Sequence, residues 1–129
     1  MTVEEYLAYE KETGIKHEYI DGEIFAMSGG TDRHSQIKAN CIVEVGYQLR
    51  KNTCILYDSD MKVKVSESKY VYPDFSIVCE KAIFADDAHT MLINPTLVAE
   101  VTSDSSKSYD KIQKANSTGA CPQYRHISS

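Results

Sequence analysis

The sequence has 129 residues, of which 42% are hydrophobic and 26% are charged, values typical of a globular protein with one hydrophobic core. The formal net charge of −5 argues against a protein that coats nucleic acid nonspecifically, because that binding needs many Lys and Arg contacts to phosphate. No stretch approaches the ~18 apolar residues of a membrane span, and the first residues do not resemble a signal peptide. We therefore expect a single cytoplasmic domain over residues 1–129, with no membrane partner.

Four cysteines are present, and none of them forms a C-x-x-C pair. This spacing argues against a structural zinc site. Three of the four lie in apolar runs, which predicts buried free thiols. The cysteines are Cys41, Cys54, Cys79 and Cys121.

The first third of the chain predicts a helix followed by a β-hairpin. Residues 2–13 are expected to form a short helix, because Thr2 and Glu5 have the spacing of a capping box. Residues 17–27 then place Asp21-Gly22 between two β-prone flanks, which is a strong hairpin signal.

Residues 32–51 predict the longest helix of the chain. Thr31 is expected to cap it, after a glycine-rich loop. An apolar stripe recurs every four residues, as is typical of a helix packed on a core. The stripe consists of Ile37, Cys41, Val45 and Leu49. His34 falls in the first turn of the same stripe, where a packing or capping role is commoner than a catalytic one.

A half-exposed strand is expected at residues 61–65. Its residues alternate between apolar and charged types, which places Lys62 and Lys64 on the outward face.

Two short apolar runs, residues 70–79 and 96–102, each carry one carboxylate in mid-run. Both runs are rich in Val and Ile and are bounded by polar or Pro-containing segments, which predicts two buried strands. Because side chains alternate between the two faces of a strand, Asp74 and Glu100 fall on the less apolar faces. The expected core faces carry Phe75, Ile77, Leu97 and Val101. A buried carboxylate pair suggests a divalent cation, a basic partner or raised pKa values.

An Asp and a Glu on neighbouring strands, with a Lys nearby, are the groups needed to hydrolyse a phosphodiester with a hard divalent cation. The carboxylates hold Mg²⁺ through oxygen, the cation activates water, and the Lys orients that water or steadies the developing charge. Three lysines follow the second strand at spacings that place them on one face of a helix, where a solvated charged surface is the alternative interpretation. They are Lys107, Lys111 and Lys114.

Several local sequences, in their order along the chain, carry a family resemblance. They are Glu18-Tyr-Ile-Asp-Gly-Glu23, Met27-Ser-Gly-Gly-Thr31 with His34, Tyr72-Pro-Asp74, Leu97-Val-Ala-Glu-Val-Thr-Ser103, and Tyr109-Asp110 with Lys114. Together, over about residues 1–114, they resemble the putative restriction endonuclease family within the PD-(D/E)XK nuclease superfamily. The resemblance implies an α/β (α+β) restriction-endonuclease-like core, a mixed β-sheet flanked by helices. It also implies Asp74 and Glu100 as catalytic and metal-binding residues, with Glu18 and His34 in supporting positions.

Two features depart from the pattern of that superfamily. Where the superfamily places a Lys two residues after the acidic residue, this chain has Thr102. The resemblance therefore implies that Lys114 takes the catalytic role, although Lys107 and Lys111 share its predicted face. Residues 115–129 fit the family poorly, as in a shortened or diverged member.

Three hypotheses about function follow. The first is an endonuclease that hydrolyses DNA with Mg²⁺, or with Mn²⁺, and acts as a homodimer, because two-fold symmetry suits a two-stranded substrate. The second is a catalytically inactive nuclease-fold protein that serves as a binding or interaction module, as the absent Lys and the acidic charge suggest. The third is a carboxylate site that acts on a small phosphate ester.

Overall fold

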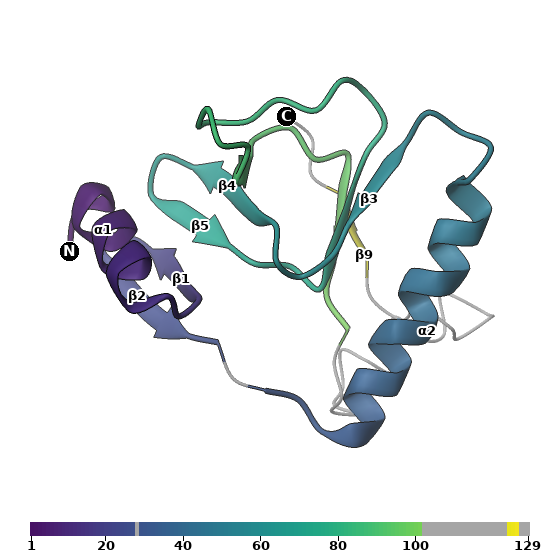
Figure 1. Cartoon of the computed structure of the whole chain (residues 1–129), viewed down its shortest axis with the longest axis horizontal. Coiled ribbons are helices and arrows are strands. Elements are labelled where there is room, and N and C mark those ends of the chain that lie inside the picture. Colours follow the sequence, from purple (N-terminus) through teal and green to yellow (C-terminus); the bar gives the residue numbers. More distant parts are fainter. Residues whose placement is uncertain (28, 102–123, 127–129) are drawn as a thin grey trace.

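The computed structural model describes residues 1–27, 29–101 and 124–126, the last three as backbone only. Within these residues the chain forms two helices and nine strands. The helices are α1 (Val3–Thr13) and α2 (Asp32–Leu49). The strands are β1 (His17–Ile20), β2 (Glu23–Ala26), β3 (Ile55–Tyr57), β4 (Lys62–Ser66), β5 (Lys69–Val71), β6 (Phe75–Val78), β7 (Met91–Leu92), β8 (Leu97–Ala99) and β9 (Tyr124–His126). Figure 1 shows α1 and α2 on opposite sides of the strands.

The strands are divided between two sheets. The first sheet has the order β2-β1-β5-β4-β7 and the second has the order β3-β6-β8-β9. Their neighbours run antiparallel except for β4 and β7, which pair in parallel. The α/β class and the mixed strand pairing expected from the sequence are therefore confirmed, and the structure adds the division into two sheets.

Three apolar clusters order the helices and sheets into layers. One joins α1 to the first sheet through Tyr6, Tyr19 and Tyr70. Another lies between the sheets and contains Val63, Val78 and Leu92. The third joins the second sheet to α2, and its buried members are Cys41, Val45, Phe75, Ile77, Ala99 and Val101. The order of layers is thus α1, first sheet, second sheet and α2. The core face predicted for β6 and β8 is confirmed.

The local signals near the N-terminus form the predicted elements. Thr2 and Glu5 make both hydrogen bonds of the capping box, and α1 ends at Gly14, which has a left-handed φ of 69°. Asp21 and Gly22 join β1 to β2 with φ values of 49° and 90°. Positive φ at both positions is what a tight hairpin turn needs.

Helix α2 also forms as predicted. The Thr31 side chain accepts a hydrogen bond from the His34 backbone N–H at 3.2 Å, which caps the helix start. Cys41 and Val45 in the apolar stripe are buried against the second sheet. Residues 103–123, where a third helix was expected, lie outside the part of the chain that the structure describes.

The run at residues 70–79, predicted as one strand, is two strands in different sheets. β5 belongs to the first sheet and β6 to the second. The intervening Pro73 has no backbone N–H, so it cannot donate to a strand ladder. The preceding N–H, from Tyr72, is donated to the Glu18 side chain at 3.0 Å. With no ladder hydrogen bond from either N–H, the chain leaves one sheet and enters the other.

Lys62 is buried rather than exposed as predicted, with 7% of its surface accessible. Its ammonium forms an ion pair with Glu10 of α1. Glu10 also accepts hydrogen bonds from the Tyr72 hydroxyl at 2.6 Å and from the His17 backbone at 3.0 Å. Burial and then the hydrogen bond to Glu10 raise the pKa of Tyr72. The prediction was wrong because α1 covers this face of β4.

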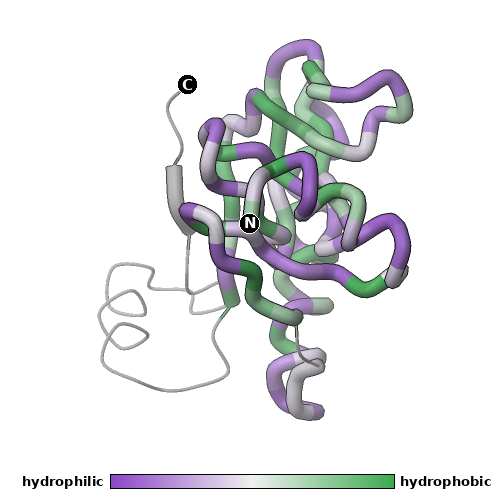
Figure 2. Tube along the Cα trace, turned by 90° about the vertical axis from the view of Figure 1, so that its left-hand side faces the viewer, coloured by the Kyte–Doolittle hydropathy of each residue, from purple (hydrophilic) through white to green (hydrophobic). Residues whose placement is uncertain are grey.

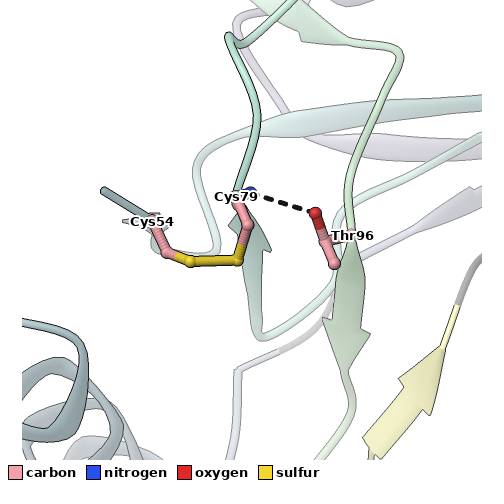
Figure 3. Close-up of a disulfide and its surroundings, with 3 residues drawn as sticks. All are labelled: Cys54, Cys79 and Thr96. Carbon is pink, nitrogen blue, oxygen red and sulfur yellow. Dashed lines mark hydrogen bonds between the residues drawn. A yellow bond between two sulfur atoms is a disulfide. The ribbon is translucent and has the colours of Figure 1, made fainter. Parts of the chain in front are cut away.

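The expectation of free thiols was wrong for two cysteines. Ile55 and Val78 are partners across β3 and β6, so the next pair outward is Cys54 and Cys79, which form a disulfide (Figure 3). The Cys79 backbone N–H also donates to the Thr96 hydroxyl at 3.0 Å. Cys41, on α2, is a fully buried thiol in the core between this helix and the second sheet, as predicted. Cys121 lies outside the described residues.

Hydrophobic segments of the trace are short and alternate with hydrophilic ones (Figure 2). Within the described residues, no helix is both long enough and apolar enough to cross a membrane.

Candidate active site

Asp74 and Glu100 lie opposite each other where β6 and β8 meet. Phe75 pairs with Ala99 in the register of these strands, and Asp74 and Glu100 are the next pair outward. They stand immediately outside the strand ends rather than in mid-strand. Both line one cleft with a volume of about 600 Å³. The strand pairing therefore brings together the two carboxylates that the sequence singled out.

The two oxygens of Asp74 have different surroundings. Oδ2 accepts a hydrogen bond of 2.6 Å from the backbone N–H of Val101. Oδ1 lies 3.8 Å from Nζ of Lys38, and 16% of the Asp74 side chain is exposed. Because Val101 follows Glu100 directly, the first contact ties the carboxylate to the end of the neighbouring strand. The other oxygen, Oδ1, faces the ammonium of Lys38 on α2.

The glycine-rich loop and the first turns of α2 form another wall of the cleft. His34, Gly29 and Gly30 all line it. A Cβ atom on Gly30 would lie 2.7 Å from the His34 ring, so any larger residue at this position would force the ring to shift. The buried Nδ1 of His34 has no hydrogen-bond partner among the described residues. The structure thus places His34 at the cleft, on the side of the helix that faces the carboxylates' strands.

Glu18 is not part of the cleft wall. Its side chain holds the backbone N–H of Tyr72, two residues before Asp74. Tyr72 itself lines the cleft. The contact therefore fixes the position of the segment between β5 and β6, which contains Asp74. A sequence pattern could not reveal this contact, because it joins residues 54 positions apart.

The sequence profile of one protein family, described as "Uma2: Putative restriction endonuclease", matches residues 3–117. The chain belongs to the Uma2 family. The resemblance found in the sequence is thereby confirmed.

Two proteins from Synechocystis sp. (strain ATCC 27184 / PCC 6803 / Kazusa) are similar to this Uma2 chain. "Uncharacterized protein sll1609" is 33% identical over 115 residues, which are 88% of this chain and 65% of that protein. "Uncharacterized protein slr1290" is 37% identical over 113 residues, or 86% of this chain and 58% of that protein. The chain thus spans less than two thirds of the length of either relative.

A crystal structure from Anabaena variabilis ATCC 29413 has a similar fold. It is described as a putative nuclease belonging to DUF820, and it aligns with a TM-score of 0.65 and 21% identity. The alignment covers 92% of this chain and 67% of that one. The likeness supports the restriction-endonuclease-like fold of the Uma2 chain.

Three lysines of this Uma2 protein were candidates from their helical spacing, and the resemblance singled out Lys114 among them. Lys107, Lys111 and Lys114, like Thr102, lie outside the described residues. Lys38 does reach Asp74, and the sequence interpretation missed it. The available signal was its position one turn after His34 on the predicted helix.

The carboxylate pair fits a hard divalent cation. The described part of the Uma2 chain contains no group of three or more His, Cys, Asp or Glu side chains suited to holding a metal ion. Mg²⁺, however, is commonly bound by one or two carboxylates, with waters and substrate phosphates as its other ligands. Two oxygen donors on an open cleft therefore suit Mg²⁺ or Mn²⁺ better than Zn²⁺, which favours His and Cys ligands.

Proposed function

We propose that this chain is a Mg²⁺-dependent endonuclease domain that hydrolyses DNA phosphodiester bonds, with Mn²⁺ as an alternative cation. The observation that carries the proposal is the placement of Asp74 and Glu100 as opposite residues on one cleft. The descriptions of the Uma2 family and of the Anabaena structure, as putative restriction endonuclease and putative nuclease, support the same reaction class.

Each residue has a proposed role. Asp74 and Glu100 would hold the cation, which when bound supplies an activated water and charge to stabilise the transferring phosphoryl group. The Val101 N–H fixes the orientation of Asp74 through Oδ2. Glu18 keeps the segment before Asp74 in place, and His34 supports the wall contributed by α2. Lys114 is proposed as the lysine that orients the attacking water.

A binding or interaction module without catalysis is the second candidate, because Thr102 stands where the superfamily has its lysine. The two candidates differ in one readout. An intact catalytic site should nick supercoiled plasmid DNA in Mg²⁺, whereas an inactive module should leave the plasmid intact under the same conditions.

The Lys114→Ala variant tests the proposed catalytic lysine. We expect it to lose nicking in Mg²⁺ and to keep the metal-induced rise in melting temperature, because the carboxylates hold the ion while the lysine acts on water and phosphate. Lys107→Ala and Lys111→Ala are the matched controls. Nicking that is lost in Lys111→Ala but kept in Lys114→Ala would assign the water-orienting role to Lys111 instead. A wild-type chain with neither nicking nor a melting shift would refute the catalytic proposal.

We also propose a homodimer in the cytoplasm. A two-fold assembly would present two equivalent sites to the two strands of DNA, and C2 dimers are the commonest soluble oligomers. Sedimentation velocity at micromolar concentration should show a species of twice the chain mass. A monomer alone at these concentrations would contradict the dimer.

A further inference from the structure

Lys38 occupies an unusual position in the cleft. It lies on α2, and 29% of its side chain is exposed. Its ammonium is 3.8 Å from Oδ1 of Asp74, within the range of an ion pair but beyond that of a hydrogen bond. Within the described residues its three N–H donors make no hydrogen bond. Among the described residues Asp74 is its one ionic partner, and an acceptor that enters the cleft would compete with Asp74 for the ammonium.

The other lysine of the cleft provides a contrast. Lys16 donates to the Ser59 carbonyl at 3.2 Å and to the Asp60 carboxylate at 3.1 Å. Its donors are already engaged with groups outside the carboxylate pair. Lys38 is therefore better suited than Lys16 to exchange one anionic partner for another.

The charges of the site make that exchange dependent on the cation. Without a metal ion, Lys38 partly offsets the negative charge of Asp74. A divalent cation at Asp74 and Glu100 would compete for the same oxygen and repel the ammonium. The four-carbon stem of lysine is flexible and lets the head group move within the cleft. A phosphate oxygen of the substrate would then be its nearest available anion.

We propose that Lys38 is a phosphate-binding residue of this site, and that it leaves Asp74 for a phosphate of the DNA strand when the cation binds. The inference rests on the proposed function and assigns a group from α2 that lines the same cleft as Asp74 and Glu100. Lys38 thereby acts on the substrate and is distinct from the lysine that orients water.

The test compares Lys38→Ala and Lys38→Gln with Lys38→Arg. Lys51→Ala is the charge-matched control, because Lys51 is exposed just beyond the end of α2, roughly 20 Å along the helix axis from Lys38. Melting curves without ligand establish that each variant is folded. Lys38→Gln keeps part of the stem and serves if Lys38→Ala does not fold.

Two binding measurements carry the result. Removing Lys38 should strengthen Mg²⁺ binding in calorimetry by about 2- to 5-fold, since an ion-pair competitor is lost. In fluorescence anisotropy with a short duplex in Mg²⁺, the same change should weaken DNA binding by roughly 10-fold. It should also lower the slope of log K against log salt by about one. Lys38→Arg should restore DNA binding, and Lys51→Ala should match the wild type in Mg²⁺ affinity.

The outcomes separate this inference from the proposed function. If the wild type nicks plasmid and Lys38→Ala matches it in DNA affinity and salt slope, Lys38 does not bind phosphate although the nuclease proposal stands. If the wild type binds DNA without cleaving it and Lys38→Ala loses that affinity, Lys38 binds phosphate and the catalytic proposal fails. Weaker Mg²⁺ binding in Lys38→Ala would show that Lys38 supports the metal site. That result would overturn the proposal that Lys38 leaves Asp74 for a phosphate when the cation binds.

Discussion

Replacing Asp74 with alanine should abolish both plasmid nicking and the rise in melting temperature that Mg²⁺ produces. Asp74 is one of the two carboxylates proposed to hold the cation, and a single remaining carboxylate would bind Mg²⁺ much more weakly. Differential scanning fluorimetry with a magnesium titration measures the loss of Mg²⁺ binding. Agarose gels of supercoiled plasmid measure the loss of nicking activity. At millimolar Mg²⁺ we expect no nicking by the variant and no rise in its melting temperature.

Asp74→Asn makes this experiment sharper. Alanine also leaves the Val101 N–H without its acceptor, which by itself destabilises a buried donor by about 1–3 kcal/mol. Asparagine retains an oxygen for that N–H but loses the charge, so it should preserve the melting temperature of the metal-free protein. Asp87→Ala, on an exposed loop position, is the control. Nicking that survives both Asp74 variants would identify a contaminating nuclease and end the catalytic case.

Replacing Phe75 with alanine should lower the free energy of unfolding by about 3–5 kcal/mol. Phe75 is fully buried, with 0% of its surface exposed, in the cluster that joins β6 to Cys41 and Val45 of α2. Truncation removes the transfer free energy of the ring and leaves a cavity between sheet and helix. Urea unfolding followed by circular dichroism measures the change.

Val43→Ala is the matched control for this prediction. Val43 is also apolar and lies on α2 between Cys41 and Val45, but its side chain points away from the sheet and the residue is 71% exposed. Its replacement should change stability by no more than about 0.5 kcal/mol. A loss below about 1 kcal/mol for Phe75→Ala would mean that β6 packs on the helix with its other face.

The helices and the hairpin could be predicted because their signals are local. The Thr2–Glu5 capping box, the Asp21-Gly22 turn and the Thr31 cap each depend on residues a few positions apart. The core faces of the two carboxylate strands could also be predicted, since alternation along a strand fixes which residues share a face. Alternation alone left it open whether the two strands are neighbours, and the resemblance implied that they share one metal site.

The remaining features depend on contacts between distant residues. The division of residues 70–79 into two strands depends on Pro73 and also on the contact of Glu18 with Tyr72, which joins distant parts of the chain. The burial of Lys62 follows from the packing of α1 over β4, with Glu10 as its partner. The cross-strand disulfide requires knowing that β3 pairs with β6. Lys38 reaches Asp74 only because α2 packs on the second sheet.

The most direct test of the central claim is a crystal structure of the chain soaked with Mn²⁺, with anomalous differences collected to locate the ion. We predict an anomalous peak in the cleft within about 2.5 Å of oxygens from both Asp74 and Glu100, a normal range for hard-cation ligands. An occupied Mn²⁺ site elsewhere, with the cleft empty and Lys38 still paired to Asp74, would contradict the claim that these carboxylates form the metal site.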